Sequence, residues 1–158
     1  MEKSHRYRAD VVWTGNLGSG TTSYGAYERS YEIRCTGKAS IMGSSDPAFR
    51  GDRRLHNPEE LLAASVSACH MLWYLHLASN AGIVVNDYRD NPVGHGETLP
   101  SGAGRFLSAV LRPTIMLQKG EDLELAAALH QKVHAFCFIA RSVNFPVSYE
   151  PTFHIEEA

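Results

Sequence analysis

The sequence lacks most features that would assign it to a specialised class of protein. It has three cysteines, an odd number and too few for the disulfide scaffold of a small secreted protein. It contains no run of about 18 uninterrupted apolar residues that could span a bilayer, and Met1–Arg6 lead into no apolar signal segment. We therefore expect a soluble, cytoplasmic protein in which each thiol needs its own explanation.

An excess of charge of one sign is also missing. The chain has 15 basic and 17 acidic residues and a formal net charge of -2, so no global field attracts nucleic acid or an anionic membrane. We expect neither as a partner. No internal repeat, low-complexity tract or linker divides the chain. Its 158 residues with 44% hydrophobic content are expected to form a single domain over residues 1–158.

The first third of the chain has the pattern of β-strands. Apolar and polar residues alternate from Tyr27 to Cys35, which is typical of a strand with one buried face. Residues 7–13 are a plausible partner strand. The glycine-rich segment 15–20 is followed by a strand pattern and not by a helix, so it is interpreted as a hairpin connection and not as a phosphate loop. Cys35 is assigned to the core.

The clearest helix begins at residues 57–60. Asn57 is a favourable N-cap residue, and Pro58 is favourable at the first helical position. The two glutamates that follow lie in the first turn, where the free amides and the positive end of the helix dipole stabilise a negative charge. Gly82 suits the end of the helix. Residues 61–78 are apolar nearly all round, which predicts burial on every side. One short chain can hardly cover such a helix alone.

A second helix is expected from Glu121 to about Ala140, with Pro146 enforcing a stop. Two further segments, 105–118 and 147–155, are rich in β-forming residues and complete the set of elements. Strands and helices therefore follow one another in the order β-β-helix-β-β-helix-β, which predicts an α+β fold.

Two cysteines lie on the predicted helices. Cys69 is in the middle of the first, where an isolated cysteine is more simply a small core residue than a nucleophile. Cys137 is on the second, at the end of a face that we expect to be buried. Packing of the two helices would bring both thiols into contact. The residues expected on that face are Leu123, Ala127, His130, His134 and Cys137.

These segments resemble the OsmC/Ohr family, the osmotically inducible and organic hydroperoxide resistance proteins. The resemblance covers nearly the whole chain and rests on residues 57–64, residues 67–69, and residues 134–137 followed by Ser142. It implies an OsmC-like α+β fold, in which two central buried helices are wrapped by antiparallel sheets in an intertwined homodimer. The two active sites of such a dimer lie at the subunit interface.

The resemblance also implies a function and roles for three residues. Cys69 corresponds to the peroxidatic cysteine, Cys137 to the resolving cysteine, and Glu59 to the carboxylate that orients a catalytic arginine. The implied activity is a thiol-dependent peroxidase, without a cofactor, that reduces organic hydroperoxides to alcohols through a Cys69 sulfenic acid and a Cys69–Cys137 disulfide. An external dithiol, for example a lipoyl protein, would then reduce the disulfide.

The chemistry calls for a cation near Cys69. The cysteine must attack as a thiolate, whereas apolar surroundings raise the pKa of a thiol. Glu59 is about ten residues, or roughly 15 Å, away along the helix, too far for the helix N-terminus to help. An arginine paired with Glu59 would bridge the gap. In the family this arginine comes from an early strand or loop, but residues 15–25 contain none, so Arg50 is preferred and Arg54 second among the loop arginines.

Other interpretations of the same residues stay open. The loop arginines, Arg53 included, can simply be a solvated basic segment. His70, His130 and His134 are candidates to line the site and move protons, or they are structural residues on helix faces. The same histidines together with Cys69 and Cys137 also offer ligands for a metal-binding or redox-sensing protein. For a cysteine hydrolase, the position of Cys69 in the middle of a helix provides no evident oxyanion hole.

Apolar residues beside the two cysteines suggest the kind of peroxide. Large apolar side chains next to either thiol favour fatty or aryl hydroperoxides over hydrogen peroxide. These side chains are Met71, Leu72, Trp73, Phe136 and Phe138.

Overall fold

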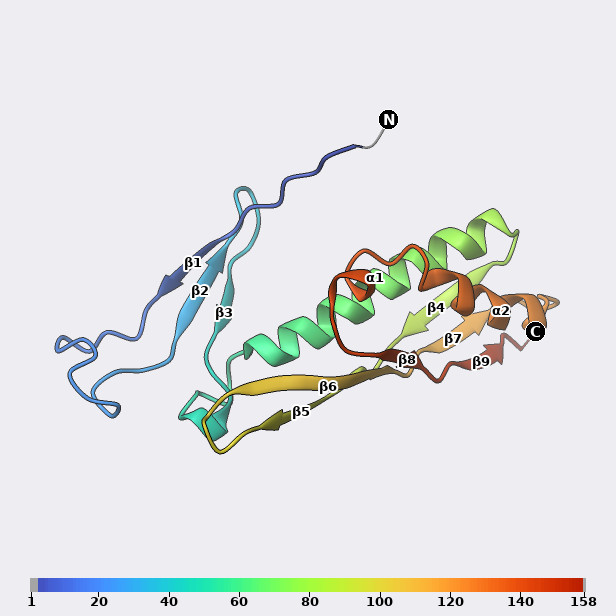
Figure 1. Cartoon of the computed structure of the whole chain (residues 1–158). Coiled ribbons are helices and arrows are strands. Elements are labelled where there is room, and N and C mark those ends of the chain that lie inside the picture. The colour runs from blue at the N-terminus through green and yellow to red at the C-terminus, as the bar shows by residue number, and fades with distance from the viewer. Residues whose placement is uncertain (1–2, 158) are drawn as a thin grey trace. The chain divides into compact units, whose positions relative to one another are not determined.

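The computed structural model describes residues 3–157, and its elements are shown in Figure 1. The chain forms two compact units, Met1–Leu61 and Leu62–Ala158. The expectation that residues 1–158 act as a single domain stays a prediction. Helix α1 (Pro58–Asn80) begins in the first unit and continues through the second.

Unit 1 (Met1–Leu61) is built on a three-stranded antiparallel sheet. Its strands are β1 (Asp10–Trp13), β2 (Tyr31–Arg34) and β3 (Ile41–Gly43), in the order β1-β2-β3. The pairing of the first two strands across the glycine-rich connection was expected, but β2 is shorter than the alternating pattern, and the short β3 was not foreseen. A 3-10 helix, η1 (Pro47–Phe49), precedes α1.

Unit 2 (Leu62–Ala158) contains two mixed sheets. One has the order β4-β7-β9, from β4 (Val85–Arg89), β7 (Thr114–Leu117) and β9 (Thr152–Ile155). The other has the order β5-β6-β8, from β5 (Val93–Thr98), β6 (Gly104–Leu111) and β8 (Val147–Tyr149). The first pair of strands in each sheet is antiparallel and the second pair is parallel. The predicted α+β class is confirmed, whereas β4 and β5 were missed.

The two long strands expected in this unit are each broken into two. The break between β6 and β7 falls at Arg112 and Pro113, and the break between β8 and β9 falls at Glu150 and Pro151. Both proline nitrogens lack the hydrogen that a continuous ladder needs. The Pro113 carbonyl still accepts from the amide of Thr152 at 2.8 Å. The parallel pairing therefore passes from one sheet to the other at a shared corner.

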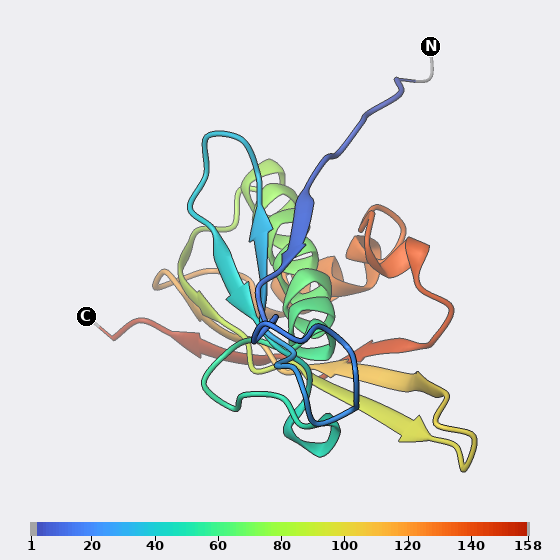
Figure 2. The same ribbon diagram turned by 90° about the vertical axis from the view of Figure 1, so that its left-hand side faces the viewer.

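The core of unit 2 lies where both helices pack on the β4-β7-β9 sheet (Figure 1 and Figure 2). Buried side chains come from α1, from β7, and from α2 (Leu123–Val133) with the segment after it. They include Tyr74, Ala78, Ile115, Leu117, Ala126, Leu129, Val133 and Cys137. This arrangement places the end of α2 opposite the middle of α1.

Helix α2 is shorter than expected. It ends at Val133 instead of about Ala140, and Cys137 lies beyond its end. The Val133 carbonyl is shared between the amides of Phe136 and Cys137, both at 2.9 Å, so tighter turns replace the last helical turns. The buried face also differs from the expected one. It is formed by Ala126, Leu129, His130, Val133 and Cys137, while Leu123, Ala127 and His134 are exposed.

Helix α1 has enough length and apolar character to cross a membrane by those criteria alone, and it is the one such helix among residues 3–157. Serines and histidines interrupt the apolar run of this helix. For this reason no membrane-spanning segment was expected from the sequence. One face of α1, including Val66, Tyr74 and Ala78, is buried in unit 2. The helix therefore serves as a core helix in this fold.

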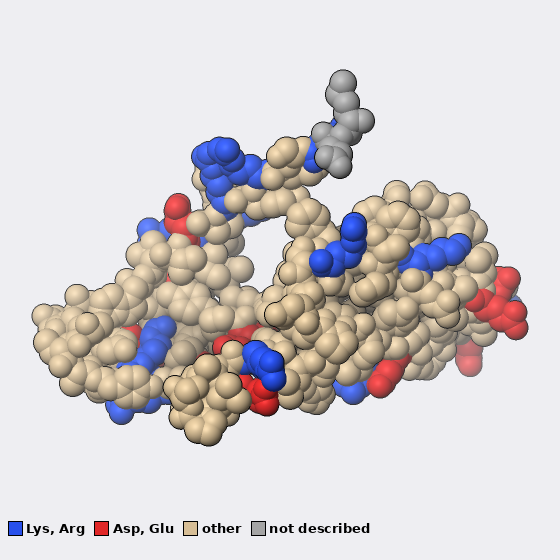
Figure 3. All heavy atoms as spheres, viewed as in Figure 1, with Lys and Arg blue, Asp and Glu red and all other residues tan. Residues whose placement is uncertain are grey.

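Charged side chains are scattered over the face of the protein shown in Figure 3, with basic and acidic groups intermixed. Several form exposed ion pairs, such as Arg105 with Glu97 at 2.7 Å across β5 and β6. Such exposed pairs contribute little to stability.

Candidate functional site: a pair of thiols between two helices

The start of α1 is held by a reciprocal cap. The Asn57 side chain accepts from the Glu60 amide at 2.7 Å, and the Glu60 carboxylate accepts from the Asn57 amide at 3.2 Å. Glu60 is therefore a capping carboxylate. At the other end, Gly82 adopts a φ of 75° just beyond the helix, a left-handed conformation that glycine adopts without strain. The local sequence thus sets the length of the helix that carries Cys69.

Cys69 and Cys137 are brought together in unit 2, as expected. Their thiols are hydrogen-bonded, and both cysteines pack in the same core cluster. Burial raises the pKa of the Cys137 thiol to about 11, with the hydrogen bond to Cys69 adding to the shift. Cys137 is fully buried and therefore stays protonated at neutral pH. Cys35 lies in unit 1, directly after β2, and is partly buried.

Two buried histidines lie beside the thiols. His70 Nε2 and His130 Nδ1 are 2.8 Å apart, and the two rings are nearly parallel at 13°. Burial lowers the pKa of His70 to about 4 and that of His130 to about 3. For His70, the nearby Asp90 charge partly opposes the effect of burial and His134 adds to it; for His130, the charge of His70 adds to the effect of burial. Both rings are neutral near pH 7, so they are poor acids for proton transfer there.

The neutral histidine pair makes stability depend on pH. Because both pKa values are lower in the folded protein, the unfolded chain binds more protons between about pH 6.5 and pH 4, and the free energy of unfolding falls as pH falls through this window. We expect a loss on the order of 3 kcal/mol for each histidine, and therefore about 6 kcal/mol for the pair, on going from pH 6.5 to pH 4. Urea unfolding at several pH values measures it. His130→Phe should flatten the dependence, and the exposed His76→Gln should not; equal slopes would contradict the assignment.

The predicted arginines are placed in unit 1. The Arg54 side chain forms a bidentate pair with Asp52 at 3.0 and 2.7 Å. Arg50 follows η1 in the left-handed region with a φ of 65°, the one such non-glycine residue in the described range 3–157. Its guanidinium is 5.6 Å from the centre of the Tyr24 ring, and no carboxylate of that range lies within ion-pair distance. Strain of this kind occurs at functional positions.

Arg29 is a cation that the sequence interpretation missed. Its guanidinium lies over the rings of Tyr24 and Tyr27, at 4.3 and 4.2 Å, and donates to the backbone carbonyls of both residues. The alternating pattern placed it on a strand, but it lies in the loop before β2. The spacing of two tyrosines and an arginine over residues 24–29 was the sequence signal that could have indicated this cation–aromatic contact.

Glu59 lies in the first turn of α1, exposed to solvent. Burial, followed by the negative charge of Glu59, raises the pKa of Tyr31 in the same unit. The Glu59 carboxylate therefore lies close enough to Tyr31 of β2 to act on its hydroxyl. Its role in orienting an arginine stays a prediction.

A metal site has no support in the part of the chain that the structure describes. No group of three histidine, cysteine, aspartate or glutamate side chains within residues 3–157 is arranged to hold a metal ion. The two imidazoles that would be the natural ligands instead bond to each other.

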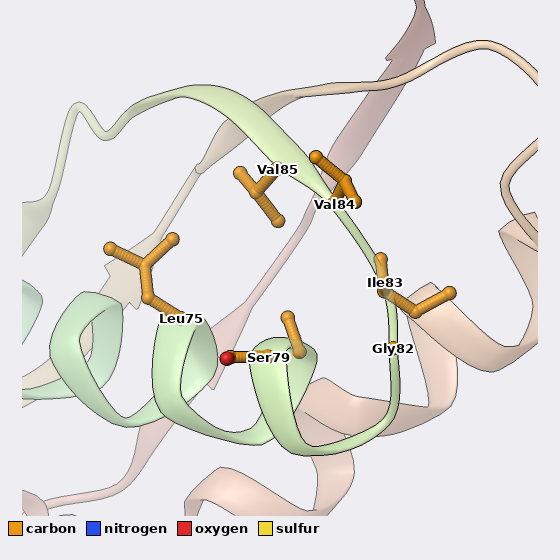
Figure 4. Close-up of a pocket in the computed structure, with 7 residues that line it drawn as sticks. Leu75, Ser79, Gly82, Ile83, Val84 and Val85 are labelled. Atoms are coloured by element: carbon orange, nitrogen blue, oxygen red, sulfur yellow. The ribbon is translucent and has the colours of Figure 1, made fainter.

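A pocket of about 330 Å³ lies elsewhere in unit 2, between the end of α1 and the start of β4 (Figure 4). Leu75 on the helix faces Val85 on the strand across it, and Ser79 contributes its one hydroxyl. Neither thiol lines this pocket. This pocket is therefore separate from the thiol pair.

The fold and site together describe an α+β protein with two thiols in contact between a core helix and the segment after a second helix. The family model described as OsmC-like protein matches residues 51–151. The chain therefore belongs to the OsmC-like protein family, which confirms the resemblance recognised from its motifs.

Solved structures agree with this assignment. An OsmC-like protein of unknown function from Vibrio cholerae is 28% identical, with a TM-score of 0.84 over 94% of this chain and 99% of that chain. An organic hydroperoxide resistance protein from Elizabethkingia anophelis is 18% identical, with a TM-score of 0.68 over 98% and 100%. One from Legionella pneumophila is 19% identical, with a TM-score of 0.66 over 95% and 98%. The search of curated proteins found no match.

Proposed function

We propose that this protein is a cysteine-based peroxidase that reduces organic hydroperoxides to alcohols. The observation that carries the proposal is the contact between Cys69 and Cys137, the second of which is buried and protonated. Membership of the OsmC-like family and the similarity to proteins named for organic hydroperoxide resistance support the same chemistry. The protein then has a redox role in the response to peroxide stress.

The proposed cycle has three steps. The Cys69 thiolate attacks one peroxide oxygen, the O–O bond breaks, and the alkoxide leaves as alcohol after taking a proton. The Cys69 sulfenic acid then condenses with the Cys137 thiol, so that an S–S bond forms and water leaves. An external dithiol finally reduces the disulfide and is itself oxidised. The high pKa of Cys137 supports its assignment to the second step, because it is not the thiolate at rest.

Exposed apolar side chains near the thiols support an organic peroxide as the substrate. Phe136 stacks on Trp73 with ring centres 5.2 Å apart and is 49% exposed. An alkyl or aryl tail would bury this surface, whereas hydrogen peroxide would not.

Treatment with one equivalent of an aryl hydroperoxide tests the proposal. The reduced protein should lose two free thiols and two hydrogens in intact mass, and peptide mapping should give a Cys69–Cys137 disulfide. Unchanged thiol counts would refute the peroxidase, and a disulfide to Cys35 would refute the assigned pair.

Arg50 is proposed as the cation that stabilises the Cys69 thiolate, oriented by Glu59. Its strained backbone and lack of a carboxylate partner within residues 3–157 favour it over Arg54, which Asp52 already neutralises. Arg50→Gly should slow sulfenic acid formation on the order of a hundredfold while stabilising the fold by about 1 kcal/mol. Glu59→Ala should also slow this step.

Stopped-flow kinetics and thermal unfolding measure the two effects of Arg50→Gly separately. Arg54→Gln is the matched control, with a small effect expected. A larger defect in Arg54→Gln than in Arg50→Gly would reverse the assignment, and full activity in both would place the cation elsewhere, with Arg29 the next residue to test.

A homodimer is proposed because both units leave apolar surface uncovered. Within the described residues of unit 1 no apolar side chain is buried, although Val11, Ile33 and Ile41 form a row across its sheet. On α1, Ala64, Ala68 and Leu72 form an exposed stripe at a spacing of four. A second copy, intertwined as in the family, would cover both surfaces.

Sedimentation velocity at micromolar concentration should therefore show a dimer. Leu72→Glu should shift it toward monomer, because the charge would enter the buried helix contact. Leu99→Glu, at the tip of the β5–β6 hairpin, is the control for an exposed leucine. A stable wild-type monomer would contradict the proposal.

A further inference from the structure

Helix α1 is tied to α2 and the segment after it by three polar contacts. The Tyr74 hydroxyl donates to the Ala126 carbonyl at 3.1 Å, His70 bonds to His130 at 2.8 Å, and Cys69 bonds to Cys137. On α1 the contacts approach the start of the helix, from Tyr74 through His70 to Cys69. Their partners follow one another along α2 and into the segment after it, from Ala126 through His130 to Cys137. The histidine pair is therefore the contact next to the thiols.

Burial of the histidine pair costs free energy. His130 is fully buried, His70 nearly so, and His130 Nε2 has no hydrogen-bond partner in the described residues. Two apolar side chains would fill the same space without an unsatisfied polar atom. Around the pair lie Tyr74 and Tyr149 as ring neighbours, and Asp90 and His134 as the charged or titratable groups that act on His70. A hydrogen bond between two rigid rings adds a defined distance and direction that packing alone lacks.

Cys137 needs such a restraint because it lies beyond the end of α2. The helix ends at Val133. Cys137 is held by a turn in which its amide and the Phe136 amide both donate to the Val133 carbonyl. For the sulfenic acid to condense, the Cys137 sulfur must reach the Cys69 sulfur as the S–O bond breaks and hydroxide leaves with the Cys137 proton as water. A small displacement of the turn would separate the two sulfurs.

We propose that His70 and His130 are positioning residues that hold Cys137 against Cys69 for closure of the disulfide. The inference rests on the proposed function only in taking these two cysteines as the redox pair. The neutral state of both rings near pH 7 fits this role, since an N–H of one ring and the free nitrogen of the other make the bond.

The experiment measures the equilibrium of the Cys69–Cys137 disulfide with reduced and oxidised dithiothreitol, without peroxide. His130→Phe should lower the equilibrium constant for disulfide formation about tenfold, the effect of losing one buried hydrogen bond. His70→Phe should give the same loss, and the double variant should be no worse, because either change removes the same bond. His130→Gln, whose amide can still pair with His70, should recover most of the loss.

Tyr74→Phe is the matched control, because it removes the contact farthest from the thiols and should change the constant less than twofold. The first peroxide step, followed by sulfenic acid formation, should be unaffected in His130→Phe. An unchanged constant in the histidine variants, additive losses in the double variant, or no disulfide in the wild type would overturn the inference. If His130→Phe does not fold, His70→Phe gives the same test from α1. A normal disulfide without peroxide consumption would instead refute only the peroxidase.

Discussion

Cys69→Ser is expected to abolish peroxide reduction. The change removes the thiolate that attacks the O–O bond in the proposed cycle, and a serine hydroxyl is too weak a nucleophile to replace it without an activating base. We expect a loss of roughly a thousandfold or more in the rate of peroxide consumption. The fold should survive, because Cys69 is only partly buried and serine has nearly the same volume.

Peroxide consumption with an aryl hydroperoxide, together with circular dichroism, measures activity and folding in the same samples. Cys35→Ser is the control, since Cys35 lies in unit 1 and has no assigned role. It should behave as the wild type. Sustained turnover by a folded Cys69→Ser variant would refute the mechanism.

Cys137→Ser should separate the two halves of the cycle. In the proposed cycle the first step needs only Cys69 and its cation, so one equivalent of peroxide should still be consumed. Without the buried thiol in contact with Cys69, the sulfenic acid persists, and excess peroxide oxidises it to sulfinic acid. The variant should therefore lose activity within a few turnovers.

Intact mass distinguishes the outcomes. Peroxide-treated Cys137→Ser should gain two oxygen atoms at Cys69, whereas the wild type loses two hydrogens. If Cys137 were only an apolar residue of the core, the variant and the wild type would behave alike. Equal turnover and equal mass would thus remove the resolving role of Cys137.

The first helix and the family were predictable from the sequence because their signals are local. The N-cap of α1, its capping box and the glycine after it act through residues three or four positions apart. The strand pairing across the glycine-rich connection is also nearly local. The two cysteines stood out because each lies in a segment that resembles the family.

The missed strands and the broken ones depend on distant neighbours. β5 contains Gly94 and Gly96, which weaken any strand pattern, yet a side chain at Gly94 would collide with the Phe106 ring of β6. The breaks at Pro113 and Pro151 were missed because the strand pattern continues on both sides of each proline. Each pattern therefore predicted one continuous strand. Their position is set by the corner between two sheets.

The sequence by itself determined α1, the α+β class and the two cysteines, because local hydrogen bonds and apolar spacing decide those features. Only the tertiary structure decided where α2 ends, which of its faces is buried, and that His70 pairs with a histidine 60 residues away. No local pattern distinguishes a histidine on a helix face from one whose nitrogen meets another ring. That distinction arises from packing of α1 against α2, where burial makes an unpaired imidazole costly and a paired one a specific link.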